Sequence, residues 1–284
     1  MKHLVLGSSG QIGAHLVKYL INKRQQVFEW DILNEPFQDL RNDHSPILDA
    51  YIKDCDIVHF LAFDVGGAKY LEKYQDSYNF IWNNITIMSN TFDVLKQQKK
   101  PFIFASSQMA EMGYSSYGIL KALGEKMTHD LGGIVARFWN VYGYEQDEEK
   151  SHVITDFIKM AKNDGVIKMR TDGTESRQFL YADDACEALF TLAKKYDKID
   201  KSKDYSITSF KWNKIYEILF GGFEDIGDEE ELSEDELEYV DKKKKTKHGY
   251  LKDGFVVDTL ESGEEDEDDG DEDDGDEDED NGED

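Results

Sequence analysis

Three tyrosine–lysine pairs in the chain have the four-residue spacing that places both side chains on one face of a helix. They are Tyr19 with Lys23, Tyr117 with Lys121, and Tyr239 with Lys243. A phenol titrates near ~10 and becomes a useful base at neutral pH only when a positive charge and a hydrogen bond stabilise its anion. A lysine one helical turn away can supply that charge. The same spacing also describes an ordinary helix face, so the surrounding sequence has to discriminate between the two.

A glycine-rich turn near the N-terminus is a second candidate site. The apolar run HLVLG leads directly into GSSGQIG, in which the glycines follow a G-x-x-G-x-x-G spacing. Glycine at a strand-to-helix junction permits a tight turn and lets the helix N-terminal amides approach a pyrophosphate. Any turn of this kind favours glycine, so the pattern alone is weak. The residues concerned are Gly7, Gly10, Gln11, Ile12 and Gly13.

Asp31 strengthens the interpretation of this turn as a dinucleotide site. It ends the second apolar run, QVFEWD, about 20 residues beyond the turn, where a carboxylate accepts the adenosine ribose hydroxyls. The same carboxylate would repel a 2′-phosphate. The turn and the acid together predict NAD as the cofactor, in preference to NADP.

Short apolar runs alternate with amphipathic segments up to about residue 223. The predicted strands are HLVLG, QVFEWD, DIVHFLA, PFIFASS and the start of GIVARFWNVYG. The predicted helices are HLVKYLINK, NITIMSNTFDVLKQ, KALGEKMTHDL, TDFIKMAKN and DDACEALFTLAKKY. This order predicts an α/β fold with a doubly wound parallel sheet covered by helices on both faces.

The remainder of the chain is rich in charge. Residues 261–284 hold 18 acids and no lysine or arginine, so about −10 of the formal net charge of −28 belongs to residues 1–260. Such a segment is predicted to be disordered, because like charges repel and it has no apolar surface to bury. Residues 224–260 form a charged linker, whose piece GYLKDGFVVDTL either docks on the body or remains part of the linker.

Composition also excludes several classes of function. The acidic surface disfavours nucleic acid as a partner. Cys55 and Cys186 lie in apolar segments without the spacing of metal ligands, so we expect two reduced, buried thiols and no metal site. The N-terminus has no signal peptide, and no apolar run reaches a membrane-spanning length. These features predict a cytoplasmic protein that does not associate with membranes.

Eight motifs, taken in order, resemble those of the extended short-chain dehydrogenase/reductase family of nucleotide-sugar epimerases and dehydratases. They are GSSGQIG, Asp31, DLR at 39–41, HFLAF, FASS, YGILK, RFWNVYG and SRQFLYADD. The resemblance covers residues 1 to about 220. It implies a Rossmann-type NAD-binding domain over 1–223, with interwoven substrate-binding segments mainly in 140–223. It also implies a homodimer that pairs through the helices bearing YGILKALGEK and TIMSNTFDVLKQ.

The resemblance selects one of the three tyrosine–lysine pairs. In the family, the pair lies on the helix after the fifth strand, and a serine or threonine at the end of that strand completes the site. Tyr117 and Lys121 follow PFIFASS in this way, and Ser107 matches the hydroxyl residue. The implied roles are Tyr117 as base, Lys121 as charge and ribose ligand, and Ser107 as hydrogen-bond donor to the substrate oxygen.

Further positions are assigned by resemblance alone. Asp39 and Leu40 match the contacts to adenine, Ala62 lies beneath the cofactor, and Phe138 lies near the nicotinamide. Asn84, Asn140 and Arg177 match positions that bind the nucleotide-sugar, the last two near its diphosphate. Each residue is equally consistent with an ordinary structural role. The loop FDVGGAKY, residues 63–70, follows the strand that ends at Ala62 and faces the substrate crevice.

The implied reaction is 4-epimerisation through a transient 4-keto sugar. The family's 4,6-dehydratases carry an Asp-Glu pair after the hydroxyl residue and its 3,5-epimerases carry a cysteine, whereas Gln108, Met109 and Ala110 stand here. A 4-ketoreductase or a 4,6-dehydratase remains an alternative. Family members usually continue for about a hundred residues beyond the matched region. A truncated substrate domain would favour a non-catalytic NAD-binding regulatory protein.

Overall fold

The computed structural model describes residues 1–42, 45–145, 147, 149–169, 171, 174 and 177–208. The predicted linker at 224–260, the acidic tail at 261–284 and the pair Tyr239 and Lys243 lie outside these residues. No helix in the described part of the chain combines the length and the apolar character needed to cross a membrane.

A six-stranded parallel sheet has the strand order β2-β1-β3-β4-β5-β8. Its strands are β1 (Lys2–Leu6), β2 (Gln26–Trp30), β3 (Ile57–Phe60), β4 (Phe102–Ser107), β5 (Ile134–Phe138) and β8 (Asp204–Ile207). The continuous apolar runs of the inner strands are buried on both faces, as expected of a covered parallel sheet. The chain leaves β1 in both directions, first to β2 and then to β3, so a switch-point crevice lies at the carboxyl ends of β1 and β3.

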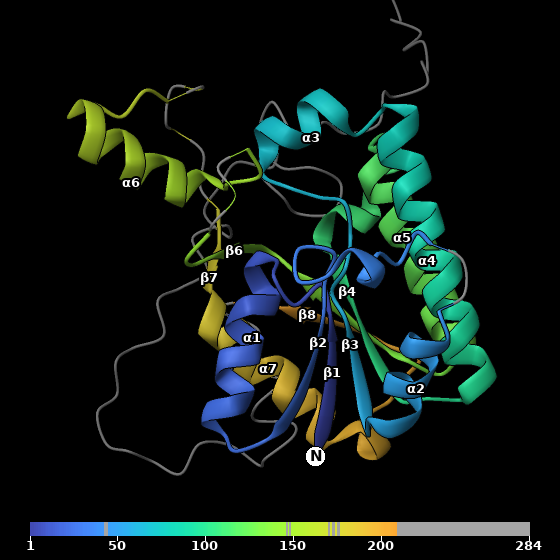
Figure 1. Ribbon diagram of the computed structural model, residues 1–284. Helices are drawn as coiled ribbons and strands as arrows, with labels where there is room; N and C mark the ends of the chain where they lie inside the picture. Colours follow the sequence, from blue (N-terminus) through green and yellow to red (C-terminus); the bar gives the residue numbers. More distant parts are fainter. Residues whose placement is uncertain are drawn as a thin grey trace, which may run out of the picture. The chain divides into compact units, whose positions relative to one another are not determined.

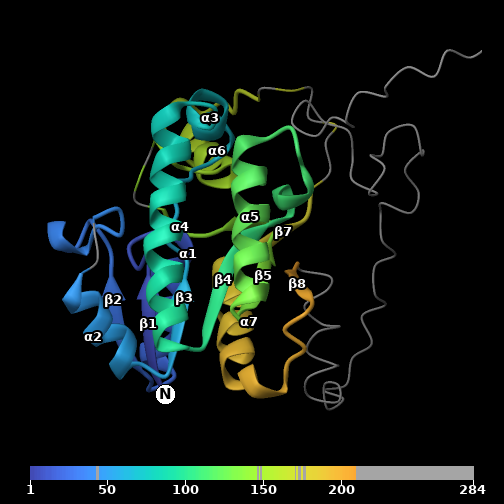
Figure 2. The ribbon, with the colours of Figure 1, turned by 90° about the vertical axis from the view of Figure 1, so that its right-hand side faces the viewer.

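Helices cover both faces of the sheet, which confirms the predicted doubly wound architecture (Figures 1 and 2). One face carries α1 (Gln11–Asn22) and α7 (Ala182–Lys194), and the other carries α2 (Pro46–Asp54), α4 (Tyr78–Gln98) and α5 (Ser116–Asp130). The remaining helices are α3 (Ala68–Tyr74), α6 (Val153–Asp164) and the short 3₁₀ turns η1 (Pro36–Gln38), η2 (Gln108–Glu111) and η3 (Tyr196–Lys198).

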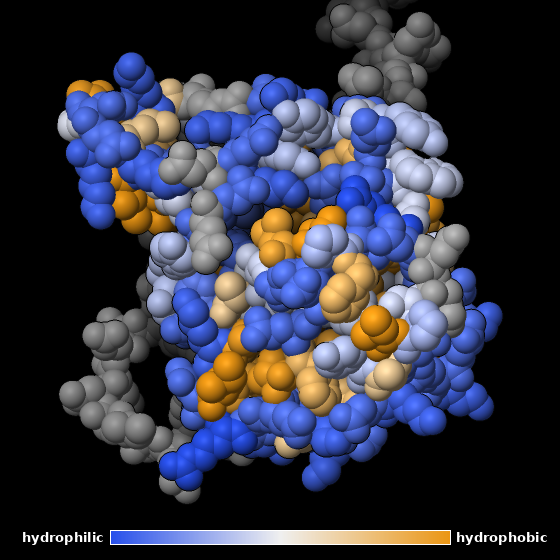
Figure 3. All heavy atoms as spheres, viewed as in Figure 1, coloured by the Kyte–Doolittle hydropathy of each residue, from blue (hydrophilic) through white to orange (hydrophobic). Residues whose placement is uncertain are grey.

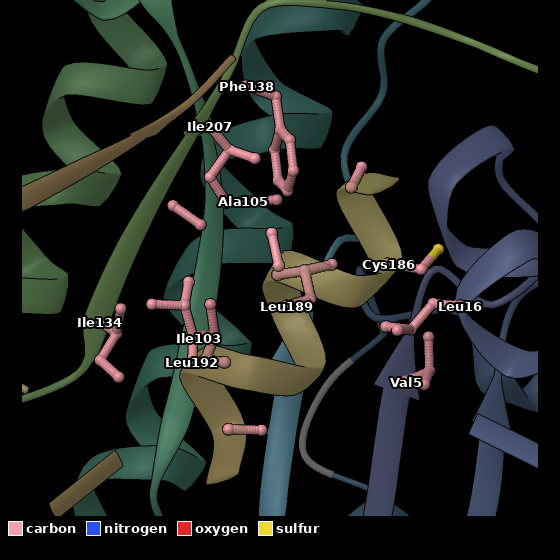
Figure 4. Close-up of a cluster of buried hydrophobic side chains, with 14 of the residues drawn as sticks. Val5, Leu16, Ile103, Ala105, Ile134, Phe138, Cys186, Leu189, Leu192 and Ile207 are labelled. Atoms are coloured by element: carbon pink, nitrogen blue, oxygen red, sulfur yellow. The ribbon is translucent and has the colours of Figure 1, made fainter. Parts of the chain in front are cut away.

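The core beneath α7 is built from small residues on the helix and branched residues on the sheet. Leu189 and Leu192 of α7 point toward Ile103 of β4, and Cys186 lies beside Leu16 of α1 (Figure 4). Cys186 and Cys55 are both buried free thiols, as predicted. Burial raises the pKa of Cys55 to about 11, so this thiol is unreactive at neutral pH.

Two buried histidines connect the central strands. His3 Nδ1 lies 2.9 Å from His59 Nε2, and the rings are stacked with centroids 5.2 Å apart. The remaining ring nitrogens, His3 Nε2 and His59 Nδ1, have no hydrogen-bond partner within the described residues. Burial lowers the pKa of His3 to about 4 and that of His59 well below its usual value, so both rings are neutral at physiological pH.

The structure departs from the sequence prediction in two places. The family strand count makes FASS the end of a fifth strand, but it ends β4, because no strand forms between Trp30 and Ile57 in the described residues. Pro36 starts the 3₁₀ turn η1 there instead, and proline suits the first position of such a turn. RFWNVYG continues beyond β5 into β6 (Asn140–Tyr142), which pairs with β7 (Phe179–Tyr181) as a separate small parallel sheet.

Helix α6, within the predicted substrate-binding segment, is far less buried than the helices on the main sheet. It has no buried residue, and Val153 and Ile158 are exposed. Figure 3 shows the surface as mostly hydrophilic, with scattered hydrophobic side chains that include some over α6 at the upper left. Charged contacts hold its first turn, since Asp156 pairs with Lys69 of α3 at 2.6 Å and accepts from Ser151.

Candidate active site

The carboxyl end of β4 and the first turns of α5 bring the predicted trio together. Ser107 is the last residue of β4, and Tyr117 and Lys121 lie one turn apart on α5. Ser115 caps this helix, with its Oγ accepting a hydrogen bond from the Gly118 amide at 3.1 Å. The cap fixes where the helix starts, and therefore where Tyr117 points.

The three side chains are buried together. Ser107 and Tyr117 are each 8% exposed and Lys121 is 4% exposed. Ser107 Oγ donates to Gln108 Oε1 and accepts from the Met109 amide, each at 3.2 Å, and its interaction with the phenol lowers the pKa of Tyr117. Lys121 Nζ donates to the carbonyl oxygen of Ala105 at 2.7 Å. A hydroxyl, a phenol and an ammonium are thus collected at one edge of the sheet, where parallel-sheet enzymes bind substrate.

Burial dominates the electrostatics of the trio. It raises the pKa of Tyr117 to about 12, with the hydrogen bond from Ser107 acting in the opposite direction. It lowers the pKa of Lys121 to about 7, while Glu125 raises it. From the sequence, the lysine charge is expected to lower the pKa of the phenol. The structure differs, because desolvation is the largest effect and the ammonium donates to Ala105 instead.

An ion pair between the buried Glu125 and the half-buried Arg137 lies near the trio, and the sequence did not predict it. Glu125, one turn beyond Lys121, accepts from Arg137 Nε and Nη2, each at 2.7 Å, and from Ser106 Oγ at 2.6 Å. Arg137 Nη1 also donates to Glu111 at 2.6 Å. The sequence signals for this network are an arginine inside the apolar strand IVARF and a glutamate four residues after Lys121. The network ties α5 to β4 and β5 at the end where the trio lies.

The glycine turn has the geometry of a dinucleotide cradle. Gly7 has φ +85°, and a Cβ on it would lie 2.7 Å from the Ala62 amide nitrogen, so only glycine fits there. Gly10 caps α1 without any side-chain hydrogen bond, whereas serines cap α2, α4 and α5. The first amides of α1, at Gln11, Ile12 and Gly13, therefore remain available to an anion. These residues fit a pyrophosphate.

Asp31 lies beside this turn, at the carboxyl end of β2. Its Oδ2 accepts from the Ser9 amide and its Oδ1 from the Leu33 amide, each at 2.9 Å. An ionised carboxylate has about four acceptor positions, so two remain for the hydroxyls of a ribose. The structure thus places an acid and a helix N-terminus on one side of the crevice, as a dinucleotide requires.

The cofactor contacts assigned by resemblance alone differ in how well the structure supports them. Ala62 lies directly against Gly7, and Phe138 pairs in register with Ser107, so both border the crevice. Asp39 is bonded through both oxygens to Arg41, which holds the pKa of that carboxyl below its usual value. Leu40 is buried. The adenine contacts assigned to Asp39 and Leu40 stay predictions.

Of the residues assigned to substrate, Asn84 lies on α4, whereas Asn140 and Arg177 lie close together at β6 and the start of β7. Asn84 is completely buried, and its amide bonds the backbone of Asp64 and Phe80, so it braces the loop after β3 in this structure. Asn140 of β6 donates to the Gln178 carbonyl at 3.1 Å. Arg177, just before β7, is exposed. Substrate contacts for all three stay predictions.

The competing pair on α1 has an ordinary structural role. Lys23 Nζ lies 5.1 Å from the centroid of the Tyr19 ring, and that ring packs edge-on against Phe190 of α7. No serine or threonine hydroxyl at a strand end is bonded to the Tyr19 phenol among the described residues. Burial raises the pKa of Tyr19 to about 12.

Comparisons with known proteins agree with this geometry. A model of the NAD dependent epimerase/dehydratase family matches residues 3–208. The chain is 27% identical over 235 residues to the UDP-N-acetyl-alpha-D-glucosaminuronate decarboxylase of Bacillus cytotoxicus, across 69% of this chain and 72% of that protein. It is 23% identical over 269 residues to the UDP-glucose 4-epimerase of Lactobacillus helveticus, across 77% and 80%.

Solved structures show the same fold. The UDP-glucose 4-epimerase from Thermotoga maritima, solved with UDP-glucose, superimposes with a TM-score of 0.62 at 20% identity. The match covers 77% of this chain and 81% of that chain. The resemblance found in the sequence is confirmed, and with it the Rossmann-type fold.

Proposed function

Since the chain belongs to the NAD-dependent epimerase/dehydratase family, we propose that it catalyses 4-epimerisation of a nucleotide-activated sugar through a transient 4-keto intermediate. The observation that carries this proposal is the buried trio itself, with Ser107 at the end of β4 and Tyr117 and Lys121 one turn apart at the start of α5. This arrangement can remove a proton from a sugar hydroxyl and return it.

The glycine turn and Asp31 are assigned to NAD. The amides of Gln11, Ile12 and Gly13 at the uncapped start of α1 bind the pyrophosphate, and Asp31 accepts from the adenosine ribose. NAD, when bound, supplies an acceptor for the C4 hydride of the sugar and afterwards its donor. The negative charge of Asp31 selects against a 2′-phosphate.

Each member of the trio has a separate role. Ser107 donates a hydrogen bond to the sugar 4-oxygen and holds it against Tyr117. The Tyr117 phenol group takes the hydroxyl proton as base and gives it back as acid. Burial holds the pKa of Tyr117 near 12 in the unliganded protein. The phenolate would therefore form only when a charged Lys121 and the positively charged nicotinamide of bound NAD stabilise it.

The residues after Ser107 favour epimerisation over the related reactions. Dehydration and decarboxylation start from the same 4-keto sugar and then need a group that acts at C5 or C6. Gln108, Met109 and Ala110 provide no carboxyl or thiol, and Met109 is buried. The next acid along the chain, Glu111, is already bonded to Arg137 at 2.6 Å. The residues after Ser107 therefore support only hydride transfer at C4.

The substrate class follows from the family and the relatives. UDP-sugars are the substrates named for the two curated relatives, and Arg177 and Asn140 are proposed to hold the diphosphate. A 4-ketoreductase or a 4,6-dehydratase is the alternative within the family. A non-catalytic NAD-binding regulator is the alternative outside this group of enzymes. The intact Ser107, Tyr117 and Lys121 argue against it, because a protein without catalysis does not require all three.

Reactions in heavy water distinguish these possibilities. The protein is incubated with NAD and UDP-glucose, UDP-galactose or UDP-N-acetylglucosaminuronate, and the products are followed by NMR and mass. Inversion at C4 without deuterium on any ring carbon is the expected result. Deuterium near C5 or C6 indicates dehydration, release of carbon dioxide indicates decarboxylation, and either outcome overturns the epimerase assignment. No turnover of any nucleotide-sugar would support the regulatory alternative.

A further inference from the structure

An aromatic side chain outside the trio contacts both Tyr117 and Lys121. Phe63 follows directly on Ala62, just beyond the carboxyl end of β3. Its ring centroid lies 3.7 Å from Lys121 Nζ. The same ring meets the Tyr117 ring edge-on, with centroids 5.8 Å apart and an angle of 79° between the planes. Phe63 therefore covers the two residues that would act on cofactor and substrate.

The Phe63 ring is the main aromatic contact that stabilises the Lys121 ammonium. The ammonium carries three N–H donors, and one of them is donated to the Ala105 carbonyl oxygen. The ring centroids of Phe104 and Tyr117 lie further from Nζ than that of Phe63, at 5.0 and 5.7 Å. A ring face attracts a cation most strongly where water is excluded. Phe63 is therefore the strongest of the three aromatic contacts.

No carboxylate in the described residues forms an ion pair with Lys121. Glu125 on α5 is the charged group that raises the pKa of Lys121, but its oxygens are bonded to Arg137 and Ser106. Strand β4 presents Phe104 and Ala105, which do not titrate. The loop after β3 presents Asp64, which pairs with Lys150 at 3.1 Å.

The loop that carries Phe63 is fixed at the next residue, Asp64. Asn84 Oδ1 accepts from the Asp64 amide at 2.7 Å, and Asn84 Nδ2 donates to the Asp64 carbonyl at 3.0 Å. The Asp64 carboxylate also accepts from Tyr70 and Asn83. Because the backbone is bound next to Phe63, its ring can leave Lys121 only by side-chain rotation.

We propose that Phe63 is a positioning residue that caps the Lys121 ammonium in the unliganded protein and rotates away when the nicotinamide ribose takes the two remaining donors. The cap keeps the ammonium ordered and dry at the catalytic edge before the cofactor arrives. This inference rests on the proposed function only for the identity of the group that displaces the ring.

Two substitutions separate the ring's electrostatic contribution from its bulk. Phe63→Leu keeps water out but removes the ring face, so the pKa of Lys121 should fall below its value of about 7, by about one unit. Phe63→Ala admits water, so the pKa should rise toward the ordinary lysine value of 10.5. The pKa is measured in cofactor-free protein by NMR titration of the lysine ε-methylene signals, assigned with Lys121→Met. Phe37→Leu makes the same chemical change at an exposed ring on η1 and should leave the titration unchanged.

Stopped-flow binding of NADH tests the displacement. Association should be faster with Phe63→Ala than with wild type, because no ring has to rotate. Equal lysine pKa values in wild type and Phe63→Leu would overturn the cap, and an unchanged association rate would overturn the displacement. If the pKa order holds while wild type turns over no nucleotide-sugar, the cap stands and the epimerase proposal falls.

Discussion

At the scale of single residues, Asp31 holds the glycine turn, and we propose that the same carboxylate selects the cofactor. It accepts from two backbone amides and lies beside the uncapped start of α1. We predict that the protein binds NAD more tightly than NADP, and that Asp31→Asn reduces this preference about tenfold, or ~1.4 kcal/mol. Calorimetric titration of both cofactors measures it.

Glu29 provides the control for this substitution. It is exposed on β2, two residues before Asp31, and Glu29→Gln makes the same change in charge. The preference should survive there. Equal affinities for the two cofactors in the wild-type protein would remove Asp31 from its assigned role.

The sequence could predict the trio but not its surroundings. Tyr117 and Lys121 are linked by helical spacing, and Ser107 by its place at a strand end. Phe63 contributes through contacts across several elements, which no local pattern encodes, and the spacing of Glu125 from Lys121 does not reveal its pairing with Arg137 on β5. The raised pKa of Tyr117 could not be predicted from the sequence either, because it is caused by burial, and burial depends on how the helix packs on the whole sheet.

At the scale of elements, helix α5 packs against the sheet through a glycine. Alanine usually stabilises a helix interior relative to glycine by about 0.5–1 kcal/mol. At Gly124, however, a Cβ would overlap the Phe104 ring and lie 3.2 Å from Met88 Sδ. Gly124→Ala should therefore lower the free energy of unfolding by about 1–3 kcal/mol, as measured by urea denaturation.

The matched control is Gly113→Ala in the turn before α5. A Cβ there would meet nothing within 4 Å, so stability should be unchanged or slightly higher. A stabilising effect of Gly124→Ala would show that α5 can shift away from β4, contrary to the packing described.

The histidine pair between β1 and β3 should make the fold sensitive to acid. The folded protein holds the pKa of His3 near 4 and that of His59 lower still, whereas unfolded histidine titrates near ~6.5. Below that pH the unfolded state binds more protons, so stability is complete above about pH 6.5 and falls as the pH decreases, by up to ~1.4 kcal/mol per unit for each histidine.

Replacing both histidines by phenylalanine tests this origin of the pH dependence. Free energies of unfolding at pH 7.5 and 5.5 are compared for wild type and the double variant. The loss between the two pH values should shrink in the variant. An unchanged loss would place the acid sensitivity elsewhere.

Elements with strong patterns could be predicted, and those that depend on distant partners could not. The buried strands DIVHF and PFIFASS are continuous apolar runs, which indicate a covered parallel sheet. The additional strand that the family's strand count implies before DIVHFLA does not form in the described residues, because a proline turn and the Asp39–Arg41 pair lie in that stretch. The pairing of β6 with β7 joins segments about forty residues apart, beyond the reach of local periodicity.

At the scale of the whole molecule, an apolar surface on α4 and α5 is consistent with the predicted homodimer. Tyr78, Trp82 and Ile85 of α4 and Ile119 and Leu123 of α5 are exposed. The Tyr78 and Trp82 rings stack with centroids 6.0 Å apart. We expect a dimer at micromolar concentration by sedimentation equilibrium, because clustered large apolar side chains usually mark an interface.

Charged substitutions locate that interface. Trp82→Glu combined with Ile119→Glu should give monomers, whereas Ile21→Glu, at an exposed position on α1, should leave the dimer intact. A wild-type monomer at micromolar concentration would contradict the predicted assembly.

The most direct test of the proposed reaction follows the hydrogen at C4. UDP-glucose deuterated at C4 is incubated in ordinary water with NAD and either wild-type protein or Tyr117→Phe, and the UDP-galactose formed is analysed by NMR. The account predicts that the C4 epimer retains its deuterium, since the same hydride returns to the opposite face. It also predicts that Tyr117→Phe still binds NAD but turns over at least about 100-fold more slowly. An epimer that has lost its C4 deuterium to solvent, or a Tyr117→Phe variant with wild-type turnover, would contradict it.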